Sequence, residues 1–284
     1  MRFIVWDEHN GKLIGLIALG DPVFNLKVRD SEIGWTSNDR EKRLVNILDA
    51  YVLGALPPYS HLLGGKLIAS LLRTKEVRNT FKSRYGKSRG RISGKRKHPS
   101  LVMVTTTSAL GRSSVYNRLS LNGCQILKSV GYTSGWGHFH IPDDLFSFVR
   151  RFLSAHDHKY ASNNRFGDGP NWRLRAVRKA LSLAGLNPNL LRHGINREVF
   201  LSYLASNAKG VLRGTAKRPK YHKLPRVTEI AQLARERWII PRAMRRPEFR
   251  HWRVQALRKK IWPKTSGTVT RHPKPALERE YGTG

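Results

Sequence analysis

The stretch "NILDAYVLGALPPYSHLLGGKLIASLL", residues 46 to 72, determines the fold that we expect. Its first eleven residues form a nearly continuous apolar run of strand length, which is typical of a buried strand. Two prolines end the run, and the segment that follows predicts a helix, with Ser60 placed to cap it. A strand, a tight turn and a helix in this order form a βα unit.

The residues before this unit predict a hairpin. "RFIVW" (2–6) and "KLIGLIALG" (12–20) have the composition of strands, and Asn10-Gly11 between them is a strong signal for a tight hairpin turn. The intervening segment up to residue 44 is expected to be a loop.

The residues after this unit continue the sheet. "LVMVTTTSA" (101–109) is rich in β-branched residues and predicts a strand, whereas residues 113–127 predict a helix or helical turn. "WGHFHI" (136–141) predicts a further strand. The expected fold class is therefore α+β, with a central mixed sheet and flanking helices.

Beyond Pro142 the pattern becomes helical. Residues 143–156 and 169–186 space their apolar residues three to four apart, and Gly185 is suited to end the second helix. We therefore expect three parts, which are an α+β domain at 1–142 with a basic loop at 82–97, a helical domain at 143–215, and a helical, strongly basic C-terminal tail at 216–284.

The composition favours a polyanionic partner. The chain has 53 Lys and Arg against 19 Asp and Glu, a net charge of +34, and 39% hydrophobic residues, enough for a core.

No apolar run approaches the roughly 18 residues that span a bilayer, and no signal-peptide pattern opens the chain, so we expect a cytoplasmic protein without a membrane partner. Cys124 is the single cysteine, which excludes internal disulfides and Cys-based zinc fingers.

Two segments concentrate this charge. Residues 82–97 carry eight basic residues and no acidic one, and residues 203–284 carry 21 Lys and Arg against 5 Asp and Glu, with tryptophans interleaved. Both patterns are typical of phosphate contacts, and exposed tryptophans would stack on the bases of a single strand. A solvated linker is the alternative for residues 82–97.

Two further motifs are candidates for nucleic-acid contact. "RFGDGPNWR" (165–173) brings glycines and arginines to a helix start, and "RHGINRE" (192–198) would place a histidine and an arginine on one face of a helix, although a capped helix entry and an internal ion pair are the structural alternatives. The candidate nucleic-acid-binding residues are Arg84, Arg89, Arg91, Arg96, Arg165, Asn171, Arg173, Arg175, His193, Arg197, Trp238, Trp252 and Trp262.

His138 and His140 lie one residue apart in the expected strand 136–141, so their side chains point to the same face. This pattern is similar to that of the HUH nucleases, in which a histidine pair helps to bind a divalent metal that activates a phosphate for attack by a tyrosine. The resemblance implies Mg²⁺ or Mn²⁺, Tyr116 or Tyr160 as the nucleophile, and Asp143 or Asp144 as a third ligand. A seam between two domains is the structural interpretation.

Carboxylates in so basic a chain are more often partners for arginine than catalytic groups. We therefore expect Asp30 and Glu32 of "RDSEIGW" (29–35) to form internal ion pairs.

Five motifs occur in order and resemble the DruA family. They are "VRDSEIGW" (28–35), "SHLLGGKL" (60–67), "GYTSGWGHFHIPDDLF" (131–146), "NRFGDGPNWRLRAVRKAL" (164–181) and "LLRHGINREVF" (190–200), within a span of about residues 13 to 215. The family is named after a component of the Druantia anti-phage system and also occurs beside transposases. The resemblance implies a prokaryotic or phage source and a role in defence or on mobile DNA, with other defence or mobile-element proteins as partners.

The order of elements up to residue 141 also resembles the Gcn5-related acetyltransferases. In that family a loop and helix start hold the pyrophosphate of coenzyme A, and "LPPYSHLLGGKL" (56–67) would occupy this place. Leu62 and Leu63 stand where small residues should admit the phosphates. Coenzyme A is therefore not expected.

The leading hypothesis is a nucleic-acid-binding protein of the DruA type, with DNA favoured over RNA. The alternatives are a metal-dependent nuclease or transposition enzyme using His138, His140 and a tyrosine, a group transferase that acts on nucleic acid, and a structural protein that coats RNA.

Overall fold

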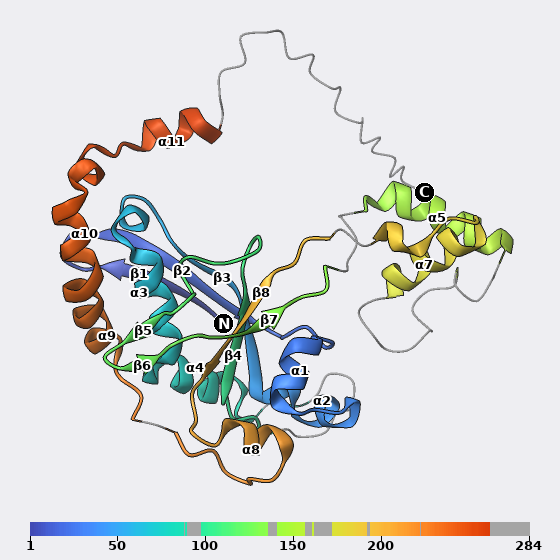
Figure 1. Cartoon of the computed structure of the whole chain (residues 1–284), viewed down its shortest axis with the longest axis horizontal. Coiled ribbons are helices and arrows are strands. Elements are labelled where there is room, and N and C mark those ends of the chain that lie inside the picture. The colour runs from blue at the N-terminus through green and yellow to red at the C-terminus, as the bar shows by residue number, and fades with distance from the viewer. Residues whose placement is uncertain are drawn as a thin grey trace, which may run out of the picture.

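The computed structural model describes residues 1–87, 89, 98–135, 141–156, 161, 172–191, 194–221 and 223–261. These residues form a mixed α+β fold around a six-stranded sheet with the order β1-β2-β3-β4-β8-β7 (Figure 1). The strands are β1 (Arg2–Asp7), β2 (Lys12–Gly20), β3 (Ile47–Ala55), β4 (Met103–Thr107), β7 (Lys128–Tyr132) and β8 (Glu198–Tyr203). The α+β class expected from the sequence is confirmed.

The first three strands are those that the sequence predicts. β1 and β2 form an antiparallel hairpin, and β3 pairs antiparallel with β2. β3 and β4 are parallel, but they pair over only three positions, from Ile47 opposite Met103 to Asp49 opposite Thr105. Beyond Asp49, the backbone of β3 pairs with β2 alone, and the Thr106 hydroxyl of β4 donates to the Ala50 carbonyl at 2.9 Å. The two parallel strands diverge after this contact.

One face of the sheet is covered by α3 (Gly64–Ser70), α4 (Lys75–Tyr85) and α9 (Val227–Ala234). Ile68, Leu72 and Phe81 of the covering segments pack with Leu48 and Phe200 of the sheet. Removal of this apolar surface from water stabilises the layer by roughly 25 cal/mol per Å². The same core contains Trp238, from the π-helical turn (Arg235–Ile239) that follows α9.

The opposite face of the central strands is covered by α1 (Lys27–Ile33) and α8 (Ala208–Arg213). Ile33 and Leu212 of these helices pack against Ile47, Met103 and Leu201 of the sheet. A third helix, α2 (Ser37–Arg43), follows α1 and begins with a capping box at Thr36. The sequence predicts a loop here, because both helices are short and polar.

A separate helical pair consists of α5 (Asp143–His156) and α7 (Trp172–Leu183), as the sequence predicts (Figure 1). It has a small core of its own, in which Phe146 meets Trp172 edge-on at 5.1 Å between ring centroids. Gly185 ends the second helix with a φ of 71°. The C-terminal elements are α10 (Ile240–Arg245), a 3₁₀ turn (Pro247–His251) and α11 (Val254–Ile261).

Two local predictions are wrong. Ser60 lies inside the 3₁₀ turn Tyr59–Leu62 and does not cap α3, which begins after Leu63 in a left-handed conformation. Residues 113–127 form turns and a small hairpin, β5 (Ser120–Leu121) and β6 (Cys124–Gln125), in place of a helix. Asn122 and Gly123, both with positive φ, favour this tight turn over a helix.

The range 143–215, expected to be helical, also contributes a strand to the main sheet. The segment expected to be helical at "RHGINRE" leads at Arg197 into β8, which lies between β4 and β7 in the sheet. Burial of β8 on both faces explains its nearly continuous apolar sequence. β7 was also not predicted. In the basic loop expected at 82–97, residues 82–85 instead form the last turn of α4.

Among the described residues, no helix combines the length and apolar character needed to span a membrane.

Candidate nucleic-acid interface

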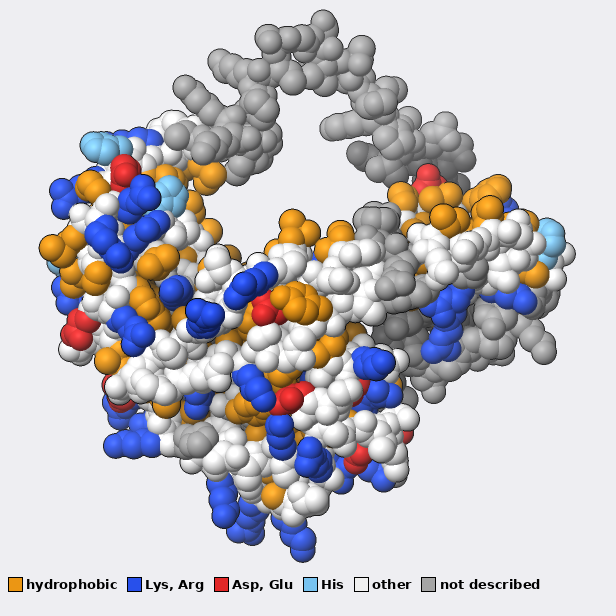
Figure 2. Space-filling model, in the orientation of Figure 1, with side chains coloured by type: hydrophobic (Ala, Val, Ile, Leu, Met, Phe, Trp, Pro, Cys, Tyr) orange, Lys and Arg blue, Asp and Glu red, His pale blue; other side chains and the backbone are white. Residues whose placement is uncertain are grey.

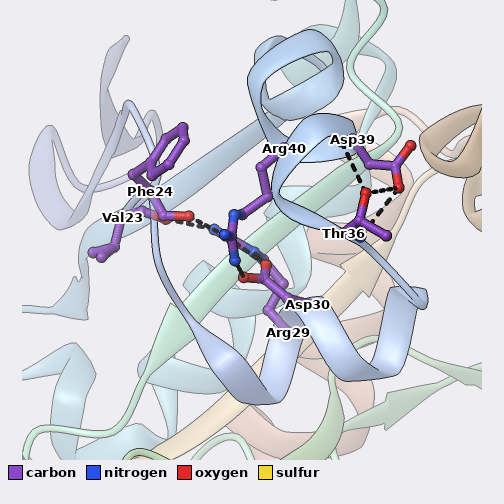
Figure 3. A network of polar contacts seen from close by, with 7 residues as sticks. All are labelled: Val23, Phe24, Arg29, Asp30, Thr36, Asp39 and Arg40. Atoms are coloured by element: carbon purple, nitrogen blue, oxygen red, sulfur yellow. Dashed lines mark hydrogen bonds and ion pairs between the residues drawn. The ribbon is translucent and has the colours of Figure 1, made fainter. Parts of the chain in front are cut away.

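Asp30 is a structural carboxylate, which agrees with the expectation from the sequence (Figure 3). The Arg29 guanidinium is fully buried and donates to Asp30 Oδ1 at 2.9 and 2.7 Å and to the carbonyl oxygens of Val23 and Phe24. Arg40 of α2 donates to Asp30 Oδ2 at 2.8 Å. Burial lowers the pKa of Arg29, and the adjacent carboxylate opposes this shift. One carboxylate therefore pairs with two arginines and joins α1 to α2.

Other carboxylates are also engaged inside the fold. Glu32 accepts from Lys128 at 2.8 Å and pairs with Lys209 at 2.7 Å, and hydrogen bonds from these two ammonium groups lower its pKa to about 2. Glu198 is buried and accepts hydrogen bonds from Ser129 Oγ and the Ser113 N–H. Asp49 accepts from Thr105, and burial raises its pKa. Because these carboxylates are engaged with partners inside the fold, they do not balance the positive charge of the other surface Lys and Arg. Figure 2 shows more Lys and Arg than Asp and Glu on the visible face.

Two segments far apart in the sequence combine to form one basic surface. The Lys75 N–H donates to the Pro225 carbonyl at 3.0 Å, Glu76 accepts from the Val227 N–H, and the Arg78 guanidinium lies 4.0 Å from the centroid of the Tyr221 ring. Tyr221 and residues 223–227 therefore lie beside the first turns of α4. We call the resulting region the α4 basic surface, and its cations are Lys75, Arg78, Lys82, Lys220, Lys223 and Arg226.

The α4 basic surface has no exposed carboxylate to balance it within the segments that form it. Glu76 is the single acidic residue of 75–89, and its carboxylate accepts a hydrogen bond from the Val227 N–H. Residues 217–226 contain no acidic residue. Arg84 and Arg89, both predicted to bind nucleic acid, are exposed at and just beyond the end of α4. The surface thus presents an uncompensated positive charge.

Lys75 and Arg78 lie outside both basic segments that the sequence assigns to phosphate contacts, and Lys82, Lys220, Lys223 and Arg226 lie inside them without having been singled out. The contacts of α4 with Tyr221, Pro225 and Val227 link positions about 150 residues apart along the chain, and composition does not show such contacts. The spacing of Lys75, Arg78 and Lys82 at i, i+3 and i+7 was a usable signal, because these positions share one face of a helix.

The C-terminal elements carry a second group of cations. Among the described residues 235–258, Arg246 and Glu248 form the one ion pair, at 3.7 Å and highly exposed, so it contributes little to stability. Arg242 donates to the His61 carbonyl. This anchors α10 to the turn that precedes α3.

The stacking role predicted for Trp238 is incorrect. Its side chain is 8% exposed in the main core, with the Lys66 ammonium 5.6 Å from the ring centroid, so no base can reach the ring without unfolding this part of the chain. The apolar spacing of "TEIAQLARERWI" was the signal for a core position. Trp252 is half-buried, and its stacking role stays a prediction.

In the helical pair, Arg173 is already engaged. It donates to Asp143 at 3.1 Å and to the Ile141 carbonyl at 3.0 Å, and its guanidinium lies 4.2 Å from the centroid of the Phe146 ring. Arg175 is exposed on the same helix and also has an interaction partner. The Arg197 N–H donates to Thr133 Oγ1 and its side chain is exposed.

Several predicted residues lie outside the described part of the chain. They are Arg91, Arg96, His138, His140, Tyr160, Arg165, Asn171, His193 and Trp262. Their proposed roles stay predictions.

Tyr116 and Asp143 belong to different parts of the fold. The Tyr116 hydroxyl donates to the Leu53 carbonyl at 3.1 Å, its ring packs edge-on against Phe200, and burial raises its pKa. Asp143 is 94% exposed at the start of α5 and pairs with Arg173. Within the described ranges, no group of three or more His, Cys, Asp or Glu side chains could hold a metal ion.

A pocket of about 310 Å³ lies where β3 and β4 diverge, lined by Gly54, Ser60, Lys66, Ser113 and Tyr116, among others. Its single cation is Lys66, whose ammonium faces Trp238. One lysine does not fit the pyrophosphate of coenzyme A. The pocket therefore gives no support to cofactor binding.

Comparison with known protein families identifies the chain. A sequence model of the family described as "Druantia protein DruA" matches residues 1–214. The chain belongs to the DruA family. A DruA relative, the "Druantia protein DruA" of Escherichia coli (strain UMEA 4076-1), is 56% identical over 257 residues. The match covers 90% of this DruA-family chain but 64% of the relative. No solved structure matches the chain.

Proposed function

We propose that this DruA-family chain binds nucleic acid, with DNA favoured, as part of anti-phage defence or of a process on mobile DNA in the cytoplasm of a prokaryotic cell. The observation that carries the proposal is the α4 basic surface. Six cations from two distant segments meet there, and the one acidic side chain of these segments bonds to the backbone. The backbone of a nucleic acid presents phosphates in a regular array, and such an array is the polyanion that this surface is suited to bind.

The proposal includes an acetyltransferase-like architecture for the sheet. Its support is the divergence of the parallel strands β3 and β4 and the helix α3, which follows β3 after one 3₁₀ turn. We do not extend the likeness to the chemistry of that family, because the pocket at the divergence has Lys66 as its single cation, and the ammonium of that residue faces Trp238.

Fluorescence anisotropy with labelled single- and double-stranded DNA and RNA tests the proposal. Affinity should fall steeply with salt, by about 10³-fold between 50 and 200 mM for six phosphate contacts to duplex DNA. The double variant Lys82→Glu/Lys223→Glu should weaken binding at least tenfold, whereas Lys12→Glu, an exposed reversal on the hairpin, should change it far less. Binding that hardly responds to salt and to the double variant would contradict the proposal.

A cleavage assay tests the nuclease alternative. Incubation with Mg²⁺ or Mn²⁺ and with EDTA, for the natural chain and for His138→Ala/His140→Ala, reports on strand cleavage. Metal-dependent cleavage that the histidine variant lacks would favour an enzyme. Binding without cleavage in all samples would favour a recognition protein.

A further inference from the structure

A small pocket opens within the α4 basic surface, and we call it the Tyr221 pocket. It has a volume of about 280 Å³ and lies between the second half of α4, residues 98–101 that lead into β4, and Tyr221. This volume is close to the lower end of the range for small-molecule sites. The pocket can therefore hold one small ligand but not a length of polymer.

The charged side chains of the pocket lining are cationic. Arg78 and Lys82 line it beside the polar side chains of His98 and Ser100, and no Asp or Glu is among its lining residues. Arg78 lies 4.0 Å from the Tyr221 ring centroid, and its single side-chain hydrogen bond to the described part of the chain is a long one, 3.5 Å, to Asn79. Most of its donors are thus available to a ligand, as is the exposed Lys82 ammonium. The pocket is suited to an anion.

The remaining lining is aromatic and apolar. Phe81 and Leu101 are 3% and 1% exposed and belong to the main core, and buried Pro99 continues this floor. A free phosphate would gain nothing from such a floor. A planar base would gain from it, and also from the Arg78 guanidinium, whose central carbon lies over the Tyr221 ring.

We infer that the Tyr221 pocket binds one nucleotide unit, with the base between the apolar floor and the Arg78–Tyr221 stack and the phosphate beside Lys82 and His98. The inference rests on the proposed function and deepens it, because a pocket too small for a length of polymer, within a phosphate-binding surface, takes the end of a strand. A 5′-phosphorylated strand end and a free nucleoside monophosphate share this chemistry.

The test uses the full chain and a 12-nucleotide single strand labelled at its 3′ end, with either a 5′-phosphate or a 5′-hydroxyl. Anisotropy gives both affinities, and adenosine 5′-monophosphate, adenosine and inorganic phosphate serve as competitors. We expect at least a tenfold preference for the 5′-phosphate. Lys82→Gln should reduce this preference to below about threefold, whereas Lys223→Gln, on the same surface but not in the pocket lining, should weaken both strands equally.

Two Tyr221 variants test the stacking wall. Tyr221→Leu should abolish the preference, and Tyr221→Phe, which keeps the ring, should retain it. Because Tyr221 also packs against both cores, circular dichroism should first establish that each variant folds. Lys82→Gln changes an exposed side chain, so it decides the question even if the leucine variant unfolds.

The outcomes distinguish the two sources and the two proposals. If the chain prefers the 5′-phosphorylated strand and the monophosphate also competes, the pocket binds both ligands. A preference for the 5′-phosphate without competition supports the strand end as the ligand. Competition without that preference supports the free nucleotide. Salt-sensitive binding with neither effect would overturn the inference and leave the proposed function standing. Absence of binding to either strand at low salt would overturn both.

Discussion

Replacement of Asp30 by alanine should be among the most damaging single substitutions in this chain. Arg29 is fully buried, and Asp30 is the one carboxylate that pairs with it among the described residues. Without that carboxylate, the guanidinium would keep two carbonyl partners, of Val23 and Phe24, and only the more distant charge of Asp49 (Figure 3). Arg40 would lose its acceptor as well.

The expected loss follows from this geometry. Removal of one partner of a buried ion pair costs about 3–5 kcal/mol, because a charge is left uncompensated in the interior. That is a large share of the 5–15 kcal/mol by which domains are usually stable. Asp30→Asn keeps an acceptor oxygen and the side-chain shape but loses the charge, so it should cost roughly half as much.

Urea denaturation followed by tryptophan fluorescence measures these free energies of unfolding. Asp39→Ala is the matched control, because that carboxylate pairs with Arg43 and caps α2 in a position about one quarter exposed. It should cost clearly less than Asp30→Ala, because solvent screens this exposed ion pair. A loss of less than about 1 kcal/mol for Asp30→Ala would refute the reasoning, since it would mean that water or another group neutralises Arg29.

Three further predictions concern other parts of the fold. Glu32 has a pKa of about 2 in the folded chain against an ordinary 4.5, so its ion pairs stabilise the fold above pH 4.5 and this contribution disappears as the pH falls toward 2. Because its lysine partners are almost half exposed, Glu32→Gln should remove only about 1 kcal/mol at pH 7 and flatten the acid branch of the stability curve. Gly15→Ala should lower the melting temperature, because the new Cβ would meet the Gly54 carbonyl and lie 2.8 Å from an Ile68 carbon. The expected loss of stability is about 1–3 kcal/mol. Gly54→Ala is the control, because a Cβ at that position meets nothing within 4 Å. Trp238→Ala should cost about 3–5 kcal/mol in urea denaturation, and an unchanged stability with weakened single-strand binding would instead restore the stacking role.

The parts of the fold that the sequence predicted correctly depend on local patterns. The hairpin of β1 and β2 has its turn signal at Asn10-Gly11, and α5 has apolar residues at helical spacing. Neither needs information from distant residues. The internal role of Asp30 followed from charge balance alone, because so few carboxylates serve so many arginines.

The parts that the sequence did not predict depend on distant contacts. β8 reads as a short apolar run that a helix could also use, and its identity as a strand comes from β4 and β7 on either side. The same reason applies to the candidate interface. The residues of α4 and of 220–226 are each ordinary basic segments, and the surface exists only because the fold places one beside the other.

The position of β8 also has a consequence for how the chain is made. The strand that is synthesised last occupies an interior place in the sheet, between β4 and β7. During translation these two strands therefore emerge with a gap between them, and nearly a hundred residues separate β4 from the strand that fills it. Contacts of such long sequence separation form slowly. The nascent chain should thus need protection from aggregation until residue 203 has left the ribosome.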